Sequence, residues 1–135
     1  LTPYETIIVA SLVEREAGID ADRAKVARVI YNRLAEGMPL GIDASIAYAV
    51  GGATNGTLTA AQLDTDSPYN TRENVGLPPT PIGLPGRASL EAALHPADGP
   101  WLYYVLTSQD GSHTFTETYD EFLQAKEQCQ ALGLC

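Results

Sequence analysis

A glutamate at the end of an apolar helical stripe is the residue best placed for chemistry. Four aliphatic residues form the stripe: Ile8, Val9, Leu12 and Val13. Glu16 follows Leu12 by four positions and Val13 by three, so it continues the same face of the helix. A carboxylate facing an apolar wall is poorly solvated, and we therefore expect the pKa of Glu16 to be raised. A proton retained near neutral pH is what a general acid for glycoside cleavage requires.

Glu16 also has an ordinary structural explanation. At the last turn of a helix it can reach solvent, or it can pair with Arg23 or Arg33. Glu14 points roughly to the opposite side of the same helix. Helical periodicity alone leaves the catalytic and the structural role of Glu16 both open.

Other catalytic patterns are weaker. His95 and His113 lack metal-ligand spacing, and the chain has no GxSxG, HExxH or glycine-rich phosphate motif. Cys129 and Cys135 fit no zinc pattern. They are either free thiols or, as we predict, a disulfide formed in an oxidising compartment. What remains is carboxylates, amides and tyrosines, a set suited to sugar recognition.

The composition is that of an ordinary globular domain. Of 135 residues, 44% are hydrophobic and 19% are charged, which suits one domain with one core. A net charge of −9 without a Lys/Arg cluster would repel nucleic acid. No apolar run approaches the roughly 18 to 20 residues that span a bilayer, and no signal peptide is evident. We expect the sequence to belong to a longer protein.

Capping and hydrophobic patterns predict a helix-rich α+β domain with one β-hairpin. Thr2 to Glu5 forms a capping box before the first helix, Gly37 ends the second, and Asp43 is expected to cap the third. The expected helices span residues 3–17, 20–36, 43–48, 59–62, 89–94 and 118–132, and the expected strands 101–107 and 113–116. The segment 64–87 holds five prolines and three glycines, so we expect an ordered, functional loop there.

Short blocks of distinctive residues follow one another along nearly the whole chain. The first is Ala10-Ser11-Leu12-Val13-Glu14-Arg15-Glu16. The others are Lys25-Val26-Ala27, Asn32-Arg33-Leu34, Gly37-Met38-Pro39-Leu40, Pro68-Tyr69-Asn70-Thr71, Gly76-Leu77-Pro78-Pro79, Pro81-Ile82, Pro85-Gly86, Leu102-Tyr103-Tyr104-Val105 and Gly111-Ser112-His113-Thr114-Phe115. Together these blocks resemble the YceG-like (MltG) endolytic murein transglycosylases.

The resemblance implies that Glu16 is the catalytic acid/base of a helix-rich, lysozyme-like catalytic domain spanning residues 1–135. It also implies a transmembrane helix and a LysM-like domain that precede this domain in the family. The sequence departs from the family pattern around Asp43, at Gly41-Ile42 and Ala44-Ser45. The family's polar contact from this loop is therefore not carried over.

The implied reaction breaks the bond after N-acetylmuramic acid in nascent peptidoglycan strands and leaves a 1,6-anhydro end. One carboxyl group, with no metal or cofactor, suffices because the nucleophile is the sugar's own C6 hydroxyl. We expect Tyr69 and Asn70 to line the cleft that holds Glu16 and to contact the sugar. Asp43 and Tyr48 are the other candidate substrate-binding residues.

Two other functions stay open. A hydrolytic muramidase would use Asp43 as a second carboxylate beside Glu16, and a non-catalytic glycan-binding module would bind strands without cleaving them. For the enzyme, the resemblance implies a location at the extracytoplasmic face of the cell membrane. It also implies cell-wall synthesis enzymes, such as penicillin-binding proteins, as partners.

Overall fold

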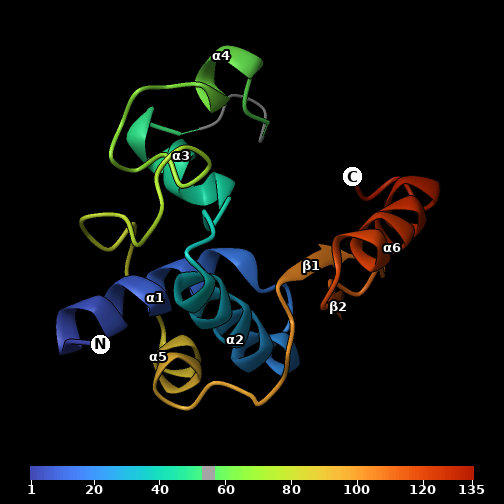
Figure 1. Ribbon diagram of the computed structural model, residues 1–135, viewed down its shortest axis with the longest axis horizontal. Helices are drawn as coiled ribbons and strands as arrows, with labels where there is room; N and C mark the ends of the chain where they lie inside the picture. Colours follow the sequence, from blue (N-terminus) through green and yellow to red (C-terminus); the bar gives the residue numbers. More distant parts are fainter. Residues whose placement is uncertain (53–56) are drawn as a thin grey trace.

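The computed structural model describes residues 1–52 and 57–135, and it is helix-rich with a single two-stranded antiparallel sheet in that part of the chain (Figure 1). Helices α1, α2 and α5 pack against one another. In the view of Figure 1, α3, α4 and a long loop lie above these helices, and the hairpin and α6 lie to their right. The elements are α1 (Pro3–Glu16), α2 (Asp20–Glu36), α3 (Asp43–Ala49), α4 (Ala60–Leu63), α5 (Arg87–Leu94), β1 (Tyr103–Leu106), β2 (His113–Thr116) and α6 (Tyr119–Ala131). The predicted α+β class is confirmed.

Helix α1 is the buried centre of the domain. The predicted capping box is present, with Thr2 accepting from the Glu5 amide and the Glu5 carboxylate accepting from the Thr2 amide. Behind this cap, Val9, Leu12 and Val13 are fully buried and belong to the main core cluster with residues of α2 and α5. Packing of this apolar face fixes the direction in which the last turn presents Glu16.

Helix α2 ends as predicted. Gly37 adopts a left-handed conformation (φ 69°), and the amides of Gly37 and Met38 bond to carbonyls of the last turn.

None of the helices in the described ranges is long and apolar enough to cross a membrane.

The hairpin pairs Tyr103 with Thr116 and Tyr104 with Phe115. Its turn residue Gly111 (φ 93°) lies against the short connection between α1 and α2. A Cβ added at Gly18 would lie 2.5 Å from the Gly111 carbonyl oxygen, so only glycine allows the two turns to approach this closely. This contact holds the hairpin beside the C-terminal end of α1.

Several predicted boundaries need correction. Helix α5 begins at Arg87 rather than 89, with Gly86 as its N-cap, and β1 is limited to Tyr103–Leu106. Asp43 is not a cap: Ile42 occupies the N-cap position of α3 and Asp43 opens its first turn. Its carboxylate is bound to an arginine instead, as described below.

A disulfide joins Cys129 in α6 to Cys135, with 5.5 Å between their Cα atoms, which confirms the predicted pairing. Cys129 is buried, whereas Cys135 is exposed in the terminal turn. We expect reduction to add two hydrogens to the mass of the intact protein. An unchanged mass after reduction under denaturing conditions would mean that the thiols are free.

Candidate active site

Glu16 is the last residue of α1, and its carboxyl group is paired with a tyrosine from the hairpin. The Tyr104 hydroxyl donates to Glu16 Oε1 at 2.6 Å. Helix α1, which carries Glu16, is anchored in the core, and the turn of the hairpin that carries Tyr104 packs against Gly18. The positions of both side chains are therefore fixed by packing. Glu16 is therefore not an exposed helix-end glutamate.

The surroundings of Glu16 favour its protonated form. Burial raises the pKa of Glu16, and the charge of nearby Asp43 adds to this effect. The hydrogen bond from Tyr104 and the charges of His113 and Arg15 lower the pKa, but burial outweighs them. A carboxyl group that keeps its proton above the ordinary range can act as a general acid.

The structural alternatives for Glu16 do not apply. Arg23 bonds to Asp20 at 2.9 Å, and the Arg33 guanidinium donates to backbone carbonyls of α2's flanking loop and of Leu102. Neither arginine is recorded in an ion pair with Glu16 among the described residues. Glu16 is hydrogen-bonded to Tyr104 in place of the arginine partner that its position at the end of a helix suggested.

Glu14 lies in the opposite environment. Its Oε1 accepts from the Gly86 amide at 2.8 Å and from the Ser89 hydroxyl at 2.9 Å, and Arg23 lies 3.6 Å away. These bonds, led by the one from Gly86, lower the pKa of Glu14. These bonds favour the ionised form of Glu14, which ties α1 to α5, whereas burial raises the pKa of Glu16 and favours its protonated form.

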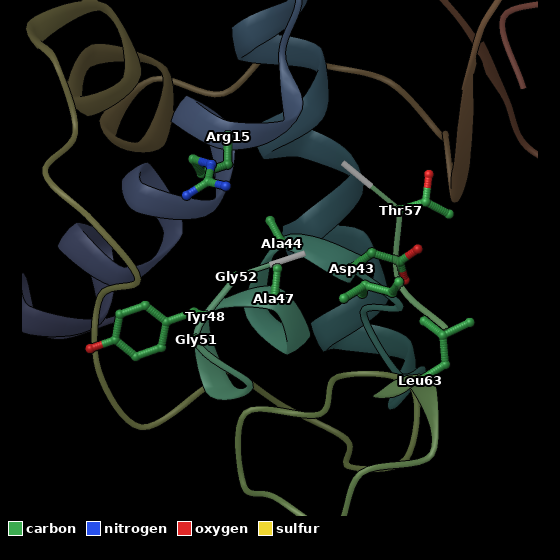
Figure 2. A pocket seen from close by; sticks show the side chains of 10 residues that line it. Arg15, Asp43, Ala44, Ala47, Tyr48, Gly51, Gly52, Thr57 and Leu63 are labelled. Atoms are coloured by element: carbon green, nitrogen blue, oxygen red, sulfur yellow. The ribbon is translucent and has the colours of Figure 1, made fainter. Parts of the chain in front are cut away.

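A cavity of about 760 Å³ opens between the end of α1, α3 and the segment that runs from Thr57 to the end of α4 (Figure 2). Arg15 reaches it from α1, and Asp43 and Tyr48 lie at the two ends of α3 (Figure 2). Glu16 is not part of the cavity wall, but it follows Arg15 in the chain, and the charge of Asp43 raises its pKa. The cavity is large enough for sugar rings, and its wall includes Arg15, the residue before Glu16.

Asp43 is bound to an arginine of the long loop. Arg72 Nε lies 2.8 Å from Asp43 Oδ1 and Nη2 lies 3.2 Å from Oδ2, a bidentate pair in which each side chain is about half exposed (47% and 51%). This pair joins α3 to the loop at Asp43, which lines the cavity. Each oxygen of this carboxylate, the second one that a two-carboxylate hydrolase would need, accepts one bond from Arg72 and has two lone pairs.

Tyr48 and Tyr69 form an aromatic pair beside the cavity. Their ring centroids are 5.1 Å apart with the planes tilted by 44°, and the Tyr69 hydroxyl bonds to Thr80 Oγ1 at 2.7 Å. Tyr48 is 48% exposed, so its ring is available for stacking on a sugar. Asp43 and Tyr48 thus line the cavity, whereas Tyr69 contacts Tyr48 without being part of the wall, and contacts of all three with substrate stay a prediction.

Asn70 does not line the cleft, contrary to expectation. Its side chain is fully buried, and its amide donates to the carbonyls of Leu63 (3.0 Å) and Thr65 (2.9 Å). Its oxygen accepts from the Arg72 amide at 3.0 Å. Because all three bonds are internal, Asn70 braces the loop that carries Tyr69 and Arg72 rather than contacting a glycan.

Three members of the site were absent from the sequence-based set: Arg15, Arg72 and Tyr104. Arg15 could have been found, since it adjoins Glu16 in the same block. Tyr104 lies 88 positions from Glu16, and nothing in the local pattern indicates that its side chain meets α1.

Comparison with known proteins supports a shared architecture. The model of the YceG-like family matches residues 1–128. The endolytic murein transglycosylase of Bacillus subtilis (strain 168) is 45% identical over 124 residues, covering 92% of this chain and 34% of that protein. The protein of the same name from Streptococcus pneumoniae serotype 2 is 35% identical over 125 residues, covering 90% of this chain and 23% of that protein.

A solved structure agrees with these matches. The crystal structure of a YceG-like protein from Listeria monocytogenes superposes with a TM-score of 0.84 at 39% identity, covering 90% of this chain and 39% of that one. The chain spans 34% of the length of its Bacillus relative and 23% of its Streptococcus relative. The family match nevertheless covers nearly the whole chain, which therefore belongs to the YceG-like family.

Proposed function

We propose that this domain is the catalytic domain of an endolytic peptidoglycan lytic transglycosylase, with Glu16 as its single acid/base. The observation that carries the proposal is a carboxyl group with a raised pKa, hydrogen-bonded to Tyr104 beside a cavity with an exposed tyrosine. The names of the Bacillus and Streptococcus relatives support the same reaction. We also propose that this catalytic domain is lysozyme-like, as the family resemblance implies.

In the first step, Glu16 donates its proton to the glycosidic oxygen between N-acetylmuramic acid and the following N-acetylglucosamine. The bond from C1 to that oxygen breaks, and the leaving sugar departs with a hydroxyl group. The C6 hydroxyl oxygen of the muramic acid then attacks C1 of the same sugar, and the carboxylate of Glu16 accepts the proton of this hydroxyl. This closes the 1,6-anhydro ring and returns Glu16 to its starting form, so no water is consumed.

The aromatic pair and the cavity provide the surfaces that would hold the strand. The exposed ring of Tyr48 can stack on the apolar face of a sugar, and Tyr69 supports it from the long loop. Asp43, held by Arg72, can accept hydrogen bonds from sugar hydroxyl or amide groups at the cavity wall. We assign substrate contact to Tyr48, Tyr69 and Asp43 on these grounds.

Asp43→Asn distinguishes this mechanism from that of a two-carboxylate muramidase. We expect the variant to keep forming 1,6-anhydro ends, because Asp43 supplies no proton and no nucleophile. Its folding should change little, since an exposed ion pair contributes only about 0 to 1 kcal/mol. Mass spectrometry of the digested strands, with the thermal midpoint measured in parallel, checks this. A folded variant that still binds strands but no longer cleaves them would support the muramidase.

We further propose that the full-length protein acts at the extracytoplasmic face of the cell membrane, on nascent strands and alongside synthesis enzymes such as penicillin-binding proteins. The support is family membership together with the disulfide, a bond typical of oxidising compartments.

A further inference from the structure

We propose that Tyr104 is a positioning residue for Glu16: its hydroxyl holds Oε1 of the carboxyl group, which leaves Oε2 to carry the proton to the glycosidic oxygen. This inference rests on the proposed function. The hydrogen bond of 2.6 Å is the single side-chain bond recorded for Glu16 within the described residues. One oxygen is thus bound by the protein, and the other, for which no hydrogen bond is recorded in the described residues, is not fully buried.

Tyr104 can orient Glu16 because its own ring is fixed. In the hairpin it lies opposite Phe115, with ring centroids 5.8 Å apart, and the ring of His113 meets it edge-on at 5.6 Å. His113 is in turn held by the buried carboxylate of Asp22, which accepts from its backbone amide at 2.8 Å and lies 3.2 Å from Nδ1. This packing keeps the hydroxyl aimed at the end of α1.

The hydroxyl of Tyr104 also keeps its proton throughout the reaction. Burial raises the pKa of Tyr104 well above its ordinary value, and the neighbouring Glu16 carboxylate raises it further. Tyr104 is therefore a permanent donor and does not compete with Glu16 as an acid. Only the strength of the bond that it donates changes when Glu16 changes charge.

A bond from a neutral hydroxyl is stronger to a carboxylate than to a carboxylic acid. Tyr104 therefore stabilises the state that Glu16 reaches after giving up its proton, and it limits the rise in pKa that burial causes. The other charged groups near Glu16 are Asp43 on α3, His113 on β2 and Arg15 on α1 itself. Removal of the Tyr104 hydroxyl alone leaves all three in place.

Tyr104→Phe in the full-length protein tests the proposal, because it deletes one oxygen and keeps the ring. We expect turnover on purified glycan strands to fall about tenfold, the value of a hydrogen bond to a charged group, with KM nearly unchanged. The alkaline limb of the pH–rate profile should move to higher pH, since Glu16 then keeps its proton longer. Tyr103→Phe is the matched control: Tyr103 is the neighbouring strand residue, and its ring packs on Tyr119 and Phe122 instead.

A second readout does not depend on activity. The Glu16 carboxyl carbon, followed by NMR as pH is raised, should titrate at higher pH in Tyr104→Phe than in the wild type and in Tyr103→Phe. The same midpoint in all three proteins would overturn the proposal, whatever the rates. If the wild-type protein cleaves no glycan, the proposed function fails, yet a raised midpoint in Tyr104→Phe would still support the hold of Tyr104 on Glu16.

Discussion

Replacing Glu16 with glutamine is expected to lower the rate of glycan cleavage by at least about 10² to 10⁴, the usual contribution of general acid/base catalysis. The amide keeps the shape of the side chain, and its oxygen can still accept the bond from Tyr104. It can neither donate a carboxylic proton nor take one back. Since one group serves both steps of the proposed reaction, no second carboxylate can replace it. The rate is measured by release of soluble products from purified strands.

The control for this substitution must remove a carboxylate without disturbing the fold. Glu14→Gln is unsuitable, because Glu14 ties α1 to α5 through Gly86 and Ser89. Glu36→Gln is better: Glu36 is exposed at the end of α2, and no side-chain bond is recorded for it in the described structure. We expect Glu36→Gln to keep wild-type activity and both variants to keep the wild-type thermal midpoint. Near-normal cleavage by Glu16→Gln would show that Glu16 is not the acid/base, whereas strand binding without cleavage by the wild-type protein would favour the glycan-binding module.

Asn70→Ala is expected to cost at least about 2 kcal/mol of folding free energy, because three backbone groups lose the partner that this fully buried side chain supplies. Three groups lose their bonds: the carbonyls of Leu63 and Thr65 and the amide of Arg72. The side chain is 0% exposed, so solvent cannot readily replace them. We also expect weaker glycan cleavage, since the loop that carries Tyr69 and Arg72 loses its brace. Denaturant unfolding gives the free energy.

Asn74→Ala is the matched control for this second prediction. Asn74 also donates to backbone carbonyls of the loop, but it is exposed, so water can take over these bonds. We expect its loss of stability to be clearly smaller. An Asn70→Ala variant of unchanged stability that fails to bind glycan would return Asn70 to the set of sugar-contacting residues.

Features set by neighbours in the chain could be predicted from the sequence. The capping box at Thr2, the glycine stop at Gly37 and the apolar stripe leading to Glu16 each depend on contacts within one or two turns. Such patterns determine where helices begin and end and which face is buried. They placed α1 and α2 correctly and put Glu16 on the buried face, whereas its expected role as the acid/base came from the family resemblance.

Features set by distant pairs could not be predicted in this way. Tyr104 contacts Glu16 because the hairpin turn packs against Gly18. No residue pattern around Gly18 or in the hairpin turn indicates this contact. Asp43 looked like a helix cap because its type suits one, but the partner available in three dimensions is Arg72. The prediction that Asn70 lines the cleft was wrong for a related reason. A polar residue in a loop is usually exposed, and the burial of Asn70 depends on how the whole loop folds.

Cleavage in water enriched in ¹⁸O tests the single-carboxylate mechanism most directly. In the proposed reaction the muramic acid C6 oxygen closes onto C1, so solvent oxygen enters no product. Mass spectrometry of the new ends should therefore show anhydro sugars, lighter than hydrolysed ends by one water and free of ¹⁸O, and Glu16→Gln should abolish them. New reducing ends that carry ¹⁸O would contradict the mechanism and show that water, activated by a second group, is the nucleophile.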